Sequence, residues 1–186
     1  MKTLNKIFWL CLMMIAIFGF NSCSDDYELP EHNLDVEFRY ELTCSEAFLK
    51  YATPQVTITD ANGSQITQTI EDNMWTGSGH KTWTQSVHYD SLNVSNTMSV
   101  TYFPKPGVTY QDEYDFDNVH YLSCLIIVQE DGEGRRNNYT IIPDFPSKTD
   151  VTASVLKKYI EGLINKSTTR GGSVDIRGEI TKIEKD

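Results

Sequence analysis

Thiols are among the most reactive side chains in proteins, and two of the four cysteines, Cys44 and Cys124, lie well inside this chain. Both fall where apolar and polar residues alternate, so both side chains are expected to point into the core. In an oxidising compartment the pair can form a disulfide that closes a loop of about 80 residues, worth roughly 4–5 kcal/mol of stability. Cysteine is also buried for packing alone. The sequence leaves both interpretations open: one bond, or two separate thiols.

The other residues that could do chemistry show no convergent spacing. No histidine pair has the spacing of a zinc motif, and the four are His32, His80, His88 and His120. The acidic stretch 112–118 offers oxygen ligands for calcium, but the glycine turn and distal glutamate of an EF-hand are missing. There is no GxSxG or SxxK nucleophile motif. We therefore expect no metal, no cofactor and no catalytic residue.

Trp75 is the candidate ligand-facing aromatic. It precedes the glycine-containing loop Thr76–Lys81, and a tryptophan beside such a loop can stack on a sugar ring. The alternative is that Met74 or Trp75 fills the open end of a β-sandwich. Arg135 and Arg136 are the only adjacent arginines, and they indicate either an anionic partner or a solvated loop.

The N-terminus has the organisation of an export signal. Lys2 and Lys6 precede the uncharged run 7–20, which is too short to span a bilayer but suits a secretory signal. The segment Phe20–Cys23 then places small residues before a cysteine, and it resembles the lipobox of bacterial lipoproteins. The resemblance implies that residues 1–22 are a cleaved signal peptide and that Cys23 carries diacylglycerol and an amide-linked acyl chain such as palmitate. An ordinary secretory signal with an incidental cysteine is the alternative.

The residues after Cys23 bear on location. Ser24-Asp25-Asp26 resembles the acidic export signal of surface lipoproteins in some Gram-negative bacteria. This resemblance implies an outer-membrane protein facing the cell exterior, with the periplasmic face as the alternative. Two or three acyl chains anchor a protein durably, whereas one does not. Residues 23–34 are acidic, contain a proline and lack periodicity, so we interpret them as a lipid-proximal tether.

Composition narrows the remaining part, residues 35–186, to one folded domain. The chain of 186 residues carries a net charge of −10, which argues against nucleic acid as a partner. Its ten tyrosines, eight phenylalanines and three tryptophans supply enough apolar area for a core and argue against disorder.

Period-two alternation, the pattern of half-buried strands, runs through this domain. It predicts strands over 35–44, 56–59, 66–70, 83–89, 98–102, 119–128, 139–142 and 173–183. Asn62-Gly63 is a strong hairpin signal between the second and third strands. Asp90–Asn93 is interpreted as the turn of a second hairpin. The run 119–128 is apolar on both faces, as in a central strand, and Glu130–Asn138 is interpreted as a loop.

Two segments have helical spacing instead. Ser45–Ala52 predicts one or two turns with Ser45 as the cap, and Thr149–Lys166 predicts an amphipathic helix at about 150–165. The longer helix lacks a strongly basic face, so it is expected to pack on a sheet and not on a membrane. The fold class is therefore mainly β: an antiparallel sandwich of about eight strands, with this helix in the last crossover.

The domain resembles the small immunoglobulin- or transthyretin-like sandwich lipoproteins of Gram-negative cell surfaces. The resemblance is one of pattern, and it implies a non-enzymatic binding or structural module attached to the membrane through its lipid. Such a module would serve glycan uptake or surface assembly, with a glycan or a surface protein as partner. The alternative function is a hydrolase on the secreted side, or an inhibitor of one.

Overall fold

In the computed structural model, residues 33–140 and 150–186 are described, except for the side chains of Arg135 and residues 137–140. These described residues belong to one compact unit. None of the helices among the described residues is long and apolar enough to cross a membrane.

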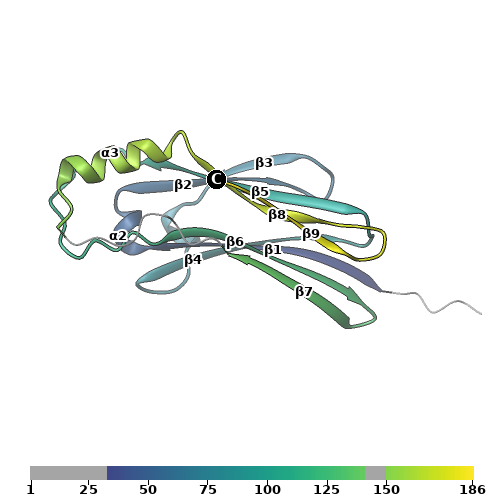
Figure 1. The fold of residues 1–186 in the computed structure, drawn as a ribbon. Coiled ribbons are helices and arrows are strands. Elements are labelled where there is room, and N and C mark those ends of the chain that lie inside the picture. The colour runs from purple at the N-terminus through teal and green to yellow at the C-terminus, as the bar shows by residue number, and fades with distance from the viewer. Residues whose placement is uncertain (1–32, 141–149) are drawn as a thin grey trace, which may run out of the picture. The chain divides into compact units, whose positions relative to one another are not determined.

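The unit is a β-sandwich of two antiparallel sheets (Figure 1), which confirms the predicted fold class. One sheet has the order β4-β1-β6-β7 and the other the order β3-β2-β5-β8-β9. The strands are β1 (Leu34–Ser45), β2 (Ala52–Thr59), β3 (Gln65–Thr69), β4 (His80–Tyr89), β5 (Val94–Pro104), β6 (His120–Glu130), β7 (Glu133–Thr140), β8 (Ser167–Val174) and β9 (Ile180–Lys185). The helices are α2 (Glu46–Leu49), the 3-10 turn η1 (Asp72–Met74) and α3 (Ala153–Leu163).

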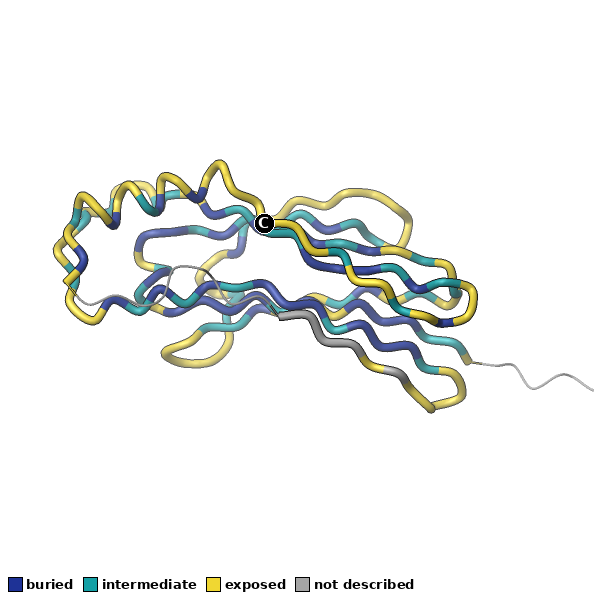
Figure 2. Tube along the Cα trace, in the orientation of Figure 1, coloured by how far each residue is buried: buried dark blue, intermediate teal, exposed yellow. Residues whose placement is uncertain are grey.

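The core lies between the two sheets, where the alternation of each strand places its apolar side chains. Phe38 and Tyr40 on β1 and Met98 on β5 are fully buried, while the intervening residues are mostly more exposed (Figure 2). On β8, Gly172 leaves room for the opposite sheet, because an added Cβ would lie 2.5 Å from Ile126 Cδ1. The sheets therefore pack closely even where β8 contributes no apolar side chain.

Both predicted helices are present, with shorter bounds. The Ser45 hydroxyl accepts a hydrogen bond from Phe48 N and caps α2. In α3, Leu156, Ile160 and Leu163 are buried against β5, and the opposite side of the helix is exposed (Figure 2). The apolar stripe is thus narrower than predicted, and Thr149 lies outside the described residues. The prediction that this helix packs on a sheet is confirmed, because α3 contacts β5.

The predicted second hairpin is wrong. Asp90–Asn93 does form a bend, but it connects β4 in one sheet to β5 in the other. β4 pairs instead with β1, from Val36 opposite Tyr89 to Ser45 opposite His80. Period two predicts where strands lie but not which strands pair, so the sheet assignment was open to this error.

The described residues contain nine strands, where about eight were predicted. Two further segments differ from their predicted structure. Most of the predicted loop Glu130–Asn138 belongs to β7, because Asp131 and Gly132 complete a two-residue turn with φ of 52° and 86°. The predicted last strand, 173–183, is instead the end of β8, a turn and most of β9. Gly178, with φ of 75°, allows the chain to reverse there.

Candidate functional site

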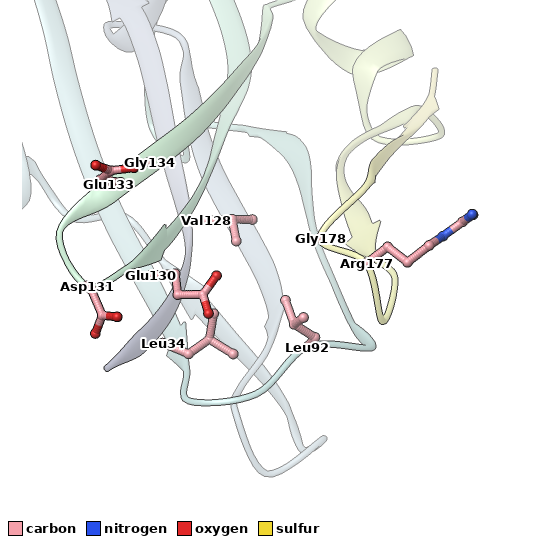
Figure 3. Close-up of a pocket in the computed structure, with 9 residues that line it drawn as sticks. All are labelled: Leu34, Leu92, Val128, Glu130, Asp131, Glu133, Gly134, Arg177 and Gly178. Atoms are coloured by element: carbon pink, nitrogen blue, oxygen red, sulfur yellow. The ribbon is translucent and has the colours of Figure 1, made fainter. Parts of the chain in front are cut away.

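A hollow of about 620 Å³, called here the end pocket, lies at the end of the sandwich where β1 begins (Figure 3). Four parts of the chain form it: the start of β1, the β4–β5 connection, the β6–β7 hairpin and the β8–β9 turn. The lining residues are Leu34, Leu92, Val128, Glu130, Asp131, Glu133, Gly134, Arg177 and Gly178. Small-molecule sites commonly have volumes of about 300–1,000 Å³, and loops on a rigid scaffold often carry binding residues.

The β6–β7 hairpin is fixed to the start of β1 on one side of the end pocket. Asp131 N donates to Asn33 O at 3.1 Å, and Asn33 N donates to Asp131 Oδ1 at 3.2 Å. The tight turn at Asp131 and Gly132 brings Glu130 and Glu133 opposite each other at the end of the ladder. The sequence therefore places three carboxylates on one short hairpin whose position is determined by β1.

The β8–β9 turn forms the other side and is organised by Asp175. Asp175 Oδ1 accepts hydrogen bonds from Arg177 N at 2.8 Å and from Glu179 N at 2.9 Å. These backbone hydrogen bonds, first from Glu179 and then from Arg177, lower the pKa of Asp175. Arg177 Nη2 also lies 3.4 Å from Asp175 Oδ2. The positive charge of Arg177 is thus paired with the Asp175 carboxylate of the same turn.

The lining of the end pocket combines apolar and acidic groups. Leu34, Leu92 and Val128 project between the hairpins with Glu130 beside them, whereas the side chains of Asp131, Glu133 and Arg177 extend from the rim and point away from them (Figure 3). Among the described side chains of the lining, three carboxylates stand against one guanidinium, which is a negative balance. An apolar surface bordered by carboxylates suits a ligand that has an apolar part and a positive charge.

The opposite end of the sandwich holds a buried polar group, called here the His120 cluster: His120, Tyr159, Asn118, Phe48 and Tyr102. Tyr159 OH lies 2.6 Å from His120 Nε2 and accepts from Asn118 Nδ2 at 3.1 Å. The Phe48 ring stacks on the His120 ring with centroids 4.4 Å apart. The Tyr102 ring packs edge-on against the same His120 ring, with centroids 4.8 Å apart. Burial lowers the pKa of His120 to about 4, so the imidazole is neutral near pH 7. The cluster connects α3 to β6.

Cys44 and Cys124 are two separate, free and buried thiols. They lie on neighbouring strands, but Cys44 is opposite His120 and Cys124 is opposite Tyr40. Four residues of offset place their Cα atoms roughly 13 Å apart along the strands, well beyond the reach of a disulfide. Burial raises the pKa of both thiols, that of Cys124 to about 12. Burial therefore favours the neutral thiol at both cysteines over the nucleophilic thiolate.

A serine, a histidine and carboxylates do meet on the outer face of the β4-β1 pair. His88 Nδ1 lies 2.9 Å from Asp35 Oδ1, but Ser86 Oγ donates to Glu37 Oε1 at 2.7 Å and not to His88. Arg39 also donates two hydrogen bonds to Glu37. Burial opposes ionisation of Glu37, but the hydrogen bonds from Arg39 and Ser86 lower its pKa overall. In this arrangement His88 does not activate Ser86, and the group is an ion-pair network.

Trp75, the aromatic residue singled out in the sequence, and the aromatic residues of the 110–116 segment have different environments. Trp75 is half-buried and packs against the core. It precedes β4, whose start pairs with the end of β1, so it lies at the opposite end from the end pocket. Phe116 is buried, and Tyr110 stacks on Tyr51 with centroids 5.3 Å apart. Tyr114 is 73% exposed. These side chains do not form a shared flat platform.

The acidic stretch 112–118 attaches its loop to neighbouring elements. Asp112 Oδ1 accepts from Ala153 N at 2.7 Å and so caps the N-terminus of α3. Asp117 Oδ2 lies 2.8 Å from His80 Nε2. Within residues 33–140 and 150–186, no group of three or more His, Cys, Asp or Glu side chains could hold a metal ion.

Cys23 and His32 lie outside the described residues, and so does the Arg135 side chain, whereas Arg136 is exposed on β7. The residues of the end pocket were not identified from the sequence, although Asp131-Gly132 was an available hairpin signal that would have brought Glu130 and Glu133 together. No protein-family model, curated protein or solved structure matches this chain.

Proposed function

We propose that this protein is a non-enzymatic binding module, held at the outer membrane by lipid on Cys23, whose end pocket receives a cationic group with an apolar stem. A basic side chain of another surface protein has this chemistry. The observation that supports the proposal is the composition of the end pocket: three apolar side chains bordered by Glu130, Asp131 and Glu133.

The proposed ligand follows from the two parts of the lining. Contact with Leu34, Leu92 and Val128 removes apolar surface of both molecules from water, which favours binding in proportion to the area. The carboxylates attract a cation and disfavour an anion of the same shape, which gives selectivity by charge. A neutral glycan is less well suited, because none of the described residues that line the end pocket has an aromatic ring.

The proposed anchor bears on where the end pocket would act. Leu34 lines the end pocket and is eleven residues after Cys23. A chain of that length spans at most about 40 Å when fully extended. With lipid on Cys23, the end pocket would therefore remain within that distance of the membrane, where other anchored proteins are concentrated.

Titration with n-hexylammonium tests the ligand class, with hexanoate as the control of equal chain length and opposite charge. In the intact protein in detergent, hexylammonium should shift the NMR amide signals of Gly134 and Gly178, and hexanoate should not. The Glu133→Gln variant should bind hexylammonium more weakly. Equal shifts with both ligands, or no shift at either glycine, would contradict the proposal.

Fractionation of a Cys23→Ala variant tests the anchor separately. Without the thiol no thioether can form, so the variant should leave the detergent phase or retain residues 1–22, as intact mass would show. Unchanged partitioning together with normal cleavage would argue against lipidation.

A further inference from the structure

The four edge strands of the sandwich differ in how they are protected. Exposed strand edges pair with other chains unless charges, prolines or bulges prevent it. β4, β7 and β9 all contain charged residues, such as Lys81, Glu133 and Lys182 respectively. β3, the edge next to β2, has the sequence QITQT and contains no charge and no proline.

The β3 edge is also open and regular. Gln65–Thr69 pairs residue by residue with Gln55–Thr59 and has no bulge. No second strand pairs with β3 in the part of the chain that is described. Four of its five residues are exposed, and Ile66 remains 48% exposed. Short, uncharged strands with β-branched residues are well suited to accept another strand.

The outer face of the sheet beside β3 is uncharged as well. On the outer face of the same sheet, Thr67 Oγ1 lies 3.0 Å from Thr57 Oγ1 of β2. The side chains that alternate outward on β2, β3 and β5 contain no acid or base, and they are Thr53, Gln55, Thr57, Thr59, Gln65, Thr67, Thr69, Ser95, Thr97, Ser99, Thr101 and Phe103. Two copies of a chain with a net charge of −10 repel each other, so they can approach most easily where both surfaces are uncharged.

We propose that β3 pairs antiparallel with β3 of a second copy, about a two-fold axis at Thr67, and extends the five-stranded sheet into the second molecule. Gln65 then lies opposite Thr69 of the second copy, and Ile66 opposite its Gln68. The register also places the flanking Glu71 opposite Gly63 of the second copy, so the Glu71 carboxylates of the two copies do not face each other. A five-residue edge buries little area, so the dimer is weak, depends on concentration and is strengthened by salt.

Disulfide trapping in the intact protein tests this register. With diamide as oxidant, Thr67→Cys should give a homodimer on a non-reducing gel, because residue 67 of each copy is on the axis. Thr57→Cys, one strand further in, and Thr181→Cys, on the charged β9 edge, are the matched controls and should remain monomeric. The wild-type protein sets the baseline, since Cys44 and Cys124 are buried.

A second change separates strand pairing from random collision. Ile66→Lys in the Thr67→Cys background adds a charge to the edge and should abolish the trapped dimer, while circular dichroism verifies the fold. The proposal is overturned by equal trapping at all three positions, by no trapping at Thr67→Cys, or by trapping that survives Ile66→Lys. Trapping of a different protein in place of a second copy would also overturn it.

Discussion

The two ends of the sandwich are built differently. At the α3 end, aromatic rings and α3 close the core around the His120 cluster, and Ile160 and Phe48 are fully buried. At the other end, Leu34 and Leu92 are only partly buried, and the end pocket opens between hairpins that carry carboxylates. This contrast suggests a division of roles, in which one end stabilises the fold and the other is available for binding.

The largest expected difference between the ends is in packing energy. Ile160→Ala should lower the free energy of unfolding by about 2–5 kcal/mol, because it leaves a cavity beneath α3. Leu92→Ala, at the end pocket, should cost about 1 kcal/mol or less, because its side chain is already partly in water. Urea titration of both variants measures the difference, and equal losses would remove the contrast between the ends.

The second-largest expected effect is a loss of stability when His120 at the α3 end is protonated. The pKa of His120 is lowered from 6.5 to about 4 in the fold, so between these values the unfolded chain binds the extra proton. Stability from this group is therefore complete above about pH 6.5 and falls as the pH approaches 4, by up to about 3 kcal/mol. Unfolding midpoints across this range measure the loss.

A pair of histidine variants isolates the contribution of His120 from that of the carboxylates. His120→Gln should reduce the fall in the free energy of unfolding between pH 6.5 and pH 4. His88→Gln, at an exposed histidine, should leave that fall unchanged. If both variants followed the wild-type curve, His120 would not be the group responsible.

The hydroxyl of Tyr159 makes a smaller contribution. Tyr159→Phe keeps the ring but removes the contacts with His120 and Asn118, and it should cost about 1–2 kcal/mol. Tyr114→Phe is the matched control, and at an exposed residue it should change stability by less than about 0.5 kcal/mol. Thermal or urea unfolding compares them. A neutral Tyr159→Phe would mean that the His120 cluster does not secure α3.

Charge removal at the end pocket should have the smallest effect on stability. Glu133→Gln should change the free energy of unfolding by less than about 0.5 kcal/mol, because Glu133 is exposed. The same substitution should weaken hexylammonium binding, which the titration above measures. A large loss of stability with unchanged binding would reverse the roles assigned to this end.

Local pattern was sufficient for much of the fold. The alternation in β1 placed Phe38, Tyr40 and Leu42 on one face, and all three are buried. Asn62-Gly63 correctly predicted the β2–β3 hairpin, with Gly63 at φ of 82°. The start of β8 was missed because Arg170-Gly171-Gly172 has no alternating apolar pattern.

The candidate site could not be predicted in the same way. The end pocket brings together residues as distant in sequence as Leu34 and Arg177, and their proximity depends on which sheet each strand joins. Because strand partners are non-local, the incorrect β4–β5 hairpin was enough to hide the contribution of Leu92. Likewise, the register that separates Cys44 from Cys124 is set by pairing across the sheet and not by local alternation.

Native-state hydrogen exchange on the intact protein tests most directly whether the two ends differ as the structure indicates. At the α3 end, the amides of Ser45 and Tyr51 donate to Val119 O and Phe48 O, and they should exchange only through global unfolding. At the end pocket, the amides of Asp131 and Gly178 should exchange through local openings that depend little on denaturant. Equal protection and equal denaturant dependence at all four amides would contradict the division of roles between the ends.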